Sequence, residues 1–195
     1  SYRIDGSSRF SQNNKYGTFP SVSASYRVGQ ESFLKDRLWI DDLKIRASWG
    51  RTGNQEIGNF TSRGLSAGGF NYIGQSGLAP TQLANPDLTW ETTEQTNIGL
   101  DFAFLKGNVN LSLDAYLKQT SGLLLEVLLP RTSGYVSSIQ NVGNVENRGI
   151  EILLNTINID KGDFRWTTDF NIAFNRNEVT HLPGGDRPLG FNGYA

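Results

Sequence analysis

The residue types that usually carry acid–base or metal chemistry are scarce in this sequence. It contains no cysteine and a single histidine, His181, which excludes thiolate sites, cysteine nucleophiles and metal centres built from several histidines. The carboxylate pairs Asp41-Asp42 and Glu91/Glu94 lack a neighbouring acid or base partner, so we interpret them as solvated. His181 precedes a Pro-Gly-Gly segment and is expected to be a plain surface residue in a loop. No enzyme activity and no cofactor are expected.

Glycine-rich and asparagine-rich segments are the candidates for phosphate and calcium binding. Gly184-Gly185-Asp186 lacks the strand and helix that flank a phosphate-binding loop, so we interpret it as a turn. The loops contain oxygen ligands suited to Ca²⁺ but not the spacing of an EF-hand. No metal site is predicted, and calcium in the loops stays an open alternative.

Composition narrows the class of protein further. The formal net charge is −1 and only 19% of the residues are charged, which gives no basic surface for nucleic acid. The chain has 22 glycines, a content that favours many turns and short strands. Its longest apolar run, Leu123 to Leu129, is interrupted by Glu126 and is too short for a transmembrane helix. Transmembrane strands stay open, because their signal is alternation.

The elements that must position these residues are predicted to be β-strands. Apolar and polar residues alternate over segments that begin near residues 2, 22, 43, 97, 109, 150 and 164, as expected of half-buried antiparallel strands. Tight turns are predicted at Lys106–Asn108 and Asp160–Asp163, and long loops at 52–90 and 119–147. Short turns that alternate with long loops are typical of outer-membrane barrels. Parity then places residues 29–42, with one helical turn at Glu31–Lys35, on the periplasmic side.

Alternation also predicts which face each side chain occupies. The lipid-facing columns are predicted to contain Leu100, Leu111, Leu113, Phe170 and Ile172, and the lumen-facing columns Asp101, Asp114, Asp169 and Asn171. Aromatic residues are predicted near both strand ends, with Phe10 and Trp49 near extracellular ends and Phe164 and Trp166 near periplasmic ends, as is typical of barrel girdles. The alternative is a soluble β-sandwich or small barrel with a core. The polar columns favour a wet lumen, since they are rich in Asn, Ser, Thr and Gly rather than Lys and Glu.

Six runs of residues occur in order along the chain: Asp5–Phe10, Gly17–Ser23, Leu43–Gly50 with Thr52–Gln55, Asn85–Glu91, Gln140–Glu151 and Asp169–Asn177. Each run alone is weakly specific, and the run QNVGNVENRGIE from Gln140 is the most specific of them. Together they resemble the barrel of SusC/RagA-type TonB-linked outer-membrane transporters.

The resemblance implies a larger protein than this chain. The family has a wide barrel of about 22 strands, an N-terminal plug and a TonB box, and works with a SusD-like surface lipoprotein to import glycans or peptides across the outer membrane. Residues 1–195 are expected to be a partial barrel domain of about seven strands, a fragment of its later part without plug, TonB box or signal peptide. The alternatives are a passive or structural outer-membrane barrel and a soluble β-sandwich binding module.

Two groups of loop residues are candidates for contact with ligand or partner. Phe70, Tyr72 and Trp90 lie in or beside the first long loop, where aromatic faces could stack on sugar rings; ordinary packing is the alternative. The apolar run around Leu125, followed by Tyr135, could contact the lipoprotein. Its alternative is that the strand starting near residue 109 simply continues above the membrane.

Overall fold

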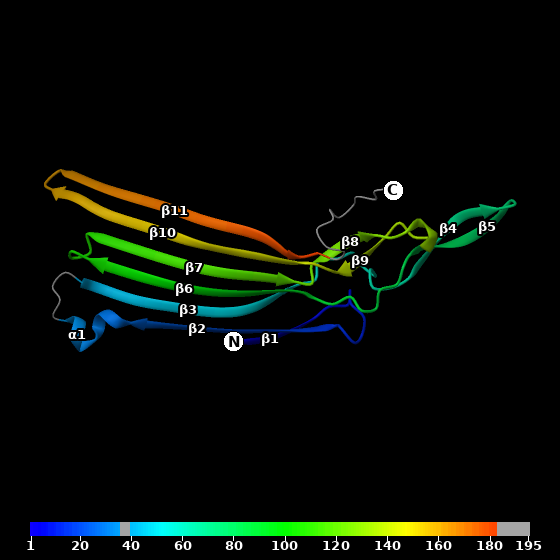
Figure 1. The fold of residues 1–195 in the computed structure, drawn as a ribbon, viewed down its shortest axis with the longest axis horizontal. Coiled ribbons are helices and arrows are strands. Elements are labelled where there is room, and N and C mark those ends of the chain that lie inside the picture. Colours follow the sequence, from blue (N-terminus) through cyan, green and yellow to red (C-terminus); the bar gives the residue numbers. More distant parts are fainter. Residues whose placement is uncertain (36–39, 183–195) are drawn as a thin grey trace.

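One antiparallel sheet organises the chain in the computed structural model, which describes residues 1–35 and 40–182 (Figure 1). Its seven strands pair in the order β1-β2-β3-β6-β7-β10-β11. They are β1 (Tyr2–Gly6), β2 (Tyr16–Arg27), β3 (Ile40–Asn54), β6 (Glu91–Phe104), β7 (Val109–Ser121), β10 (Asn144–Lys161) and β11 (Phe164–His181). Each strand lies beside its predecessor in the sheet, as in an up-and-down meander, and β1 and β11 are its edges. The predicted all-β, seven-stranded antiparallel fold is confirmed.

The remaining elements lie at the two ends of the sheet. Two separate hairpins are formed by β4 (Leu65–Tyr72) with β5 (Gln75–Gln82), and by β8 (Leu124–Leu128) with β9 (Ser137–Asn141). A short 3-10 turn, η1 (Val28–Gln30), and a one-turn helix, α1 (Ser32–Lys35), join β2 to β3, and η2 (Arg131–Ser133) lies between β8 and β9. The helical turn predicted near Glu31 is therefore present. Within the described ranges there is no helix long and apolar enough to cross a membrane, a finding that says nothing about β-barrels.

The short connections gather at one end of the sheet and the long ones at the other (Figure 1). At the turn end, β6 and β7 are joined through Leu105, Lys106 and Gly107, all with positive φ, and β10 and β11 through a two-residue turn with Gly162 at φ 55°. A positive φ causes no steric strain at glycine, and this conformation matches the twist of the two strands of a hairpin. The loop end contains both separate hairpins. The predicted alternation of tight turns and long loops is confirmed, with two exceptions: the short 7–15 loop at the loop end, and the longer β2–β3 connection with η1 and α1 at the turn end.

The strand register gives the sheet an apolar and a polar face, because directly paired residues of antiparallel strands point to the same side. One row of partners runs Ile45, Leu100, Leu113, Ile152, Ile172, and the next runs Leu43, Phe102, Leu111, Leu154, Phe170. The predicted columns thus share what we call the apolar face. Asp101, Asp114, Asp169 and Asn171 lie on the opposite, polar face.

No second sheet covers the apolar face in the part of the chain that the structure describes. Large apolar side chains such as Ile98, Ile150 and Phe174 are more than half exposed there. A β-sandwich needs two sheets packed face to face, so the single sheet does not support the soluble-sandwich alternative.

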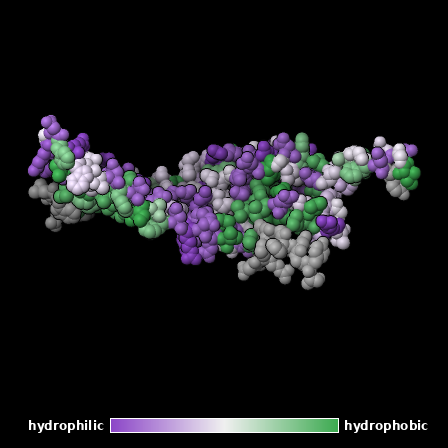
Figure 2. All heavy atoms as spheres, turned by 90° about the horizontal axis from the view of Figure 1, so that it is seen from above, coloured by the Kyte–Doolittle hydropathy of each residue, from purple (hydrophilic) through white to green (hydrophobic). Residues whose placement is uncertain are grey.

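The buried apolar residues lie at the loop end instead of under the sheet. Phe10, Phe19, Ile57, Leu88 and Trp90 form one cluster, with Leu124 and Ile139 packed against it. In a view onto the edge of the sheet, hydrophobic residues gather where the loop end begins, beside a hydrophilic patch (Figure 2). The alternation that starts at Tyr2 continues in the sequence to Phe10, but strand β1 ends at Gly6, where the chain leaves the sheet and Phe10 enters this cluster.

Candidate functional site

Two glycines make room for the aromatic centre of the loop end. A Cβ at Gly17 or at Gly53 would collide with the ring of Phe19. Trp90 packs against Phe10 and Phe19 with ring centroids 5.4 and 5.3 Å apart, in tilted and edge-on geometries that aromatic pairs prefer. The Trp90 indole N–H donates to the backbone carbonyl of Lys15 at 3.4 Å.

Hydrogen bonds from short polar side chains join the loops around this cluster. The hydroxyl of Ser62 donates to the carbonyl of Arg9 at 2.9 Å, and the Arg9 guanidinium donates to the carbonyl of Gln55 at 3.2 Å. Ser11 donates to the carbonyl of Pro86 at 2.6 Å. We call segments 7–15, 55–64 and 83–90, with the cluster between them, the loop platform. It fixes the base from which the two hairpins leave the sheet.

Asn141 attaches the β8–β9 hairpin to the loop platform. Its amide group donates to the carbonyls of Thr89 at 2.8 Å and Gly122 at 3.0 Å, and its side-chain oxygen accepts the Thr89 N–H at 2.8 Å. A second amide, that of Asn85, donates to the carbonyl of Ile139 at 2.9 Å. The Asn141 side chain therefore supplies hydrogen-bond partners for backbone groups of Thr89 and Gly122, which have no partner in a strand ladder.

The apolar run that starts at Leu123 does not continue β7 as one regular strand. Gly122 adopts φ 64° and interrupts the ladder, after which residues 124–128 form β8 and pair with β9. The run is thus one arm of a separate hairpin above β7 and β10. Backbone bonds between Leu123 and residues 142–143 join the two short segments that connect this hairpin to those strands.

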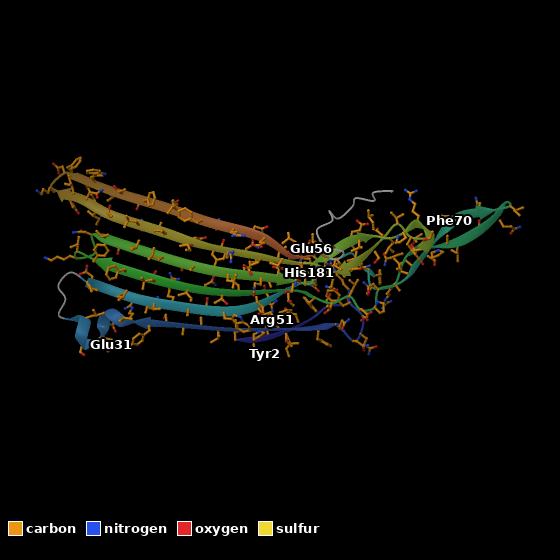
Figure 3. The ribbon with its side chains drawn as sticks, in the orientation of Figure 1. Tyr2, Glu31, Arg51, Glu56, Phe70 and His181 are labelled. Atoms are coloured by element: carbon orange, nitrogen blue, oxygen red, sulfur yellow. The ribbon has the colours of Figure 1, made fainter. Side chains whose placement is uncertain are left out.

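The structure separates the predicted ligand and partner residues. Trp90 is only 7% exposed, so its stacking surface is taken by Phe10 and Phe19, and it is a packing residue in this fold. Phe70 is 52% exposed on β4, the strand that also contains Tyr72, in the hairpin that extends beyond the loop platform (Figures 1 and 3). Leu125 lies on β8 and Tyr135 in the β8–β9 connection, both partly buried.

A charged network on the polar face was not predicted. The guanidinium of Arg46 donates to both carboxylate oxygens of Asp101, at 2.8 and 2.9 Å, and reaches Asp114 at 3.0–3.1 Å. Ser112 donates to Asp101 at 2.8 Å. Arg46 on β3 and Asp114 on β7 are separated by β6, and Arg46, Gly99 and Asp114 occupy one row of the register. A Cβ at Gly99 would lie 2.6 Å from the guanidinium carbon, so the glycine lets Arg46 lie across β6.

The same device recurs one row away. Tyr116 on β7 donates its hydroxyl to Asn175 on β11 at 2.7 Å, across Gly149 on β10. A Cβ at Gly149 would lie 2.8 Å from the Tyr116 ring. Two long side chains therefore lie flat on the polar face over a glycine of the neighbouring strand.

The carboxylates singled out in the sequence have structural partners. Asp41 accepts the N–H of Gly107 at 2.8 Å, Glu91 accepts the N–H of Leu124 at 3.2 Å, and Glu94 pairs with Arg51.

The expectation that His181 lies in a loop is wrong: it is the exposed last residue of β11, paired with Asn144. Segment 183–186 lies outside the described residues. No group of three or more His, Asp or Glu side chains suited to a metal occurs within the described ranges.

A family model described as "TonB dependent receptor-like, beta-barrel" matches residues 1–192 of this chain. The chain belongs to this family of TonB-dependent receptor barrels. Among its relatives, TonB-dependent receptor P39 of Formosa agariphila is 43% identical over 186 residues, which are 95% of this chain and 18% of that protein. TonB-dependent receptor SusC of Bacteroides thetaiotaomicron is 40% identical over 193 residues, 94% of this chain and 19% of that protein. The predicted SusC/RagA resemblance is confirmed.

Solved structures of the RagAB peptide transporter and importer contain the same fold. They match with TM-scores of 0.83 and 0.86 at 33% identity, over 93–94% of this chain and 20% of those chains. This TonB-dependent receptor barrel segment thus spans about a fifth of the length of its relatives. Its strands, glycine-bridged network and loop platform belong to that fifth.

Proposed function

We propose that residues 1–195 form a sector of the barrel wall, with its extracellular loops, in an outer-membrane protein that imports a nutrient in a TonB-dependent way. The observation that carries this proposal is the continuous, exposed apolar face that runs across the sheet from β2 to β11. Water-soluble monomers rarely expose an apolar patch larger than a few hundred Å², whereas a membrane barrel presents such a face to lipid. Leu100, Leu111, Leu113, Phe170 and Ile172 then face lipid, and the polar face lines the lumen.

The two ends of the sheet support an orientation for this sector. Outer-membrane barrels have short periplasmic turns and longer extracellular loops, so the turn end is periplasmic and the loop end extracellular. Aromatic residues at the turn end, among them Phe104, Phe164 and Trp166, then lie at the inner interface.

The experiment that tests import uses the full-length protein in its own host. A strain that lacks the gene is grown on a glycan or on a peptide mixture as the sole source of that nutrient. Import by a TonB-dependent route predicts that the full-length gene restores growth and that the same gene without its TonB box does not. Growth with both genes would instead identify a passive barrel, and growth of the deleted strain on either nutrient would remove that nutrient as the cargo.

We also propose that the loop end contacts a SusD-like lipoprotein, through the β8–β9 hairpin with Leu125 and Tyr135. Exposed apolar residues on this hairpin, Leu128 and Val136, support an interface.

The exposed Phe70, with Tyr72 on the same strand, is proposed to contact a glycan or peptide cargo. The buried Trp90 is not proposed to do so.

The partner contact is tested by copurification. Leu125→Asp combined with Val136→Asp should lower recovery of the tagged lipoprotein about tenfold, since buried apolar anchors dominate interfaces. Leu105→Asp is the control and should leave recovery unchanged, because it replaces an exposed apolar residue in the β6–β7 turn, at the opposite end of the sheet. Unchanged recovery with the hairpin variant would move the interface elsewhere.

A further inference from the structure

The apolar face ends at the loop end in charged residues. On β3, Trp49 is followed at the next same-face position by Arg51; on β10, Ile150 is followed by Arg148; on β11, Phe174 is followed by Arg176. The turn end of the same face carries aromatic rings instead, including Phe164 and Trp166. The two boundaries of the apolar face therefore differ in chemistry.

Arg148 and Arg176 are direct cross-strand partners, which is an unfavourable pairing. Like charges directly opposite each other on neighbouring strands destabilise a sheet. The next same-face pair, Glu146 and Glu178, is also a pair of like charges. Ion pairs run along each strand, at 3.6 Å from Arg148 to Glu146 and 3.1 Å from Arg176 to Glu178. Exchanging the two residues on one strand would have placed each arginine opposite a glutamate, so the observed order keeps the two guanidinium groups together.

Most of the donors of these two arginines remain available. A guanidinium has five N–H donors, and within the described ranges each of the two contacts a single carboxylate, at 3.6 Å for Arg148 and 3.1 Å for Arg176. Arg46, by contrast, is held by Asp101, Asp114 and Ser112. Two adjacent guanidinium groups with free donors suit a phosphate, because arginine binds phosphate oxygens in a bidentate, charge-assisted way.

The surface next to the arginine pair identifies what carries the phosphate. Ile150 and Phe174, the partners one row toward the turn end, are 52% and 59% exposed on the apolar face. A ligand that contacts both features has an anionic head and apolar chains. We propose that Arg148 and Arg176 bind the phosphate headgroup of an outer-leaflet lipid whose acyl chains lie against Ile150 and Phe174. The proposal rests on the proposed membrane placement, and it adds a lipid site to the wall of the barrel.

The test uses the full-length protein, purified in detergent and titrated with lipid A that carries its phosphates, with bound lipid counted by native mass spectrometry. The double variant Arg148→Gln/Arg176→Gln should bind this lipid about tenfold more weakly or worse, because two charge-assisted contacts are lost. Lipid A stripped of its phosphates should bind the wild type and the variant equally. Inorganic phosphate alone should not displace the lipid at millimolar concentration.

Arg27→Gln/Arg165→Gln is the matched control. Each of these two arginines is likewise in a single ion pair, and the side chains of all four are 51–66% exposed, but Arg27 and Arg165 lie at the turn end. The control should bind lipid A like the wild type. Equal binding by the Arg148/Arg176 variant, or displacement by inorganic phosphate alone, would overturn the proposal. Both variants should insert and import normally; if the wild-type protein fails to insert into membranes, the proposed function fails, which is a result distinct from a selective change in lipid binding.

Discussion

At the scale of single residues, the polar face depends on glycines that leave space for the side chain of another strand. Arg46 reaches Asp114 only because the residue between them in the row is Gly99, which is buried beneath the guanidinium. The role of the glycine here is spatial, since its backbone is not in the left-handed region. Replacement therefore acts through the neighbouring ion pairs.

We expect Gly99→Ala to destabilise the full-length barrel by about 1–2 kcal/mol, the usual range for losing hydrogen bonds to a charged group. The new Cβ would lie 2.6 Å from both the Arg46 guanidinium and an Asp114 oxygen, so the contact between them must open. Urea unfolding of the full-length protein in lipid vesicles measures the change. Gly68→Ala, where the nearest atom is 3.8 Å from the added Cβ, is the control. Equal losses in the two variants would contradict the bridging role of Gly99.

The second residue-scale prediction concerns the two faces. Leu113→Arg should cost about 2–4 kcal/mol if Leu113 faces lipid near the bilayer midplane. Asn171→Arg places the same charge on the polar face in a neighbouring row and should cost far less. The folded fraction of each variant, followed by heat-dependent mobility on SDS gels, gives the comparison. A similar loss from both substitutions would reverse or abolish the assignment of the faces.

At the scale of elements, the β8–β9 hairpin is positioned by side chains more than by the sheet. The left-handed Gly122 interrupts the path from β7 into β8, and Asn141 supplies the bonds to Thr89 that hold the hairpin against the loop platform. The orientation of this hairpin is thus set by a small number of polar contacts.

Asn141→Ala should loosen the hairpin while leaving the sheet intact. The amides of β8 and β9 are expected to exchange with deuterium about tenfold faster, which corresponds to about 1.4 kcal/mol of lost local stability. Gln140→Ala removes only a local contact to Ser138 and should not change exchange. If Asn141→Ala leaves the protection of residues 124–141 unchanged, other contacts position the hairpin.

At the scale of the whole molecule, the sheet is open and single-layered. Its edge strands β1 and β11 each lack a partner on one side within the described residues. Edge strands of this kind favour pairing with other chains. The exposed apolar face is also larger than the apolar patches that soluble monomers expose to water.

We therefore expect residues 1–195, expressed alone and without detergent, to aggregate or to stay unfolded. Size-exclusion chromatography combined with circular dichroism measures this directly. A monomeric β-protein with a cooperative melting transition in plain buffer would contradict the membrane placement of the apolar face.

The seven strands could be predicted because alternation and tight turns are local signals. The same signal failed at Phe10, where alternation from Tyr2 continues in the sequence while the chain leaves the sheet. The burial of Phe10 depends on Trp90 and Phe19, which are distant in sequence, so no local pattern reports it.

The site residues were harder to predict than the strands for the same reason. The Arg46 network joins residues 55 and 68 positions apart, and only the register reveals that Gly99 separates them. In the sequence, Trp90 is a candidate for ligand contact, with packing as the alternative, because its neighbours along the chain are loop residues; its neighbours in space are Phe10 and Phe19. One sequence signal indicates such a network. It is a glycine on the middle one of three strands, whose register partners on the two outer strands carry opposite charges.

The order of strands in the sheet has a consequence for how the wall is assembled. Every sheet neighbour is also the neighbour along the chain once the two separate hairpins are set aside, so no strand has to insert between two that are already paired. Each strand can join one growing edge in the order in which it is synthesised, and the entropy cost of closing the longer connections rises only slowly with their length. The sheet can therefore form by adding one strand at a time to either edge, even when long insertions separate the strands at the loop end.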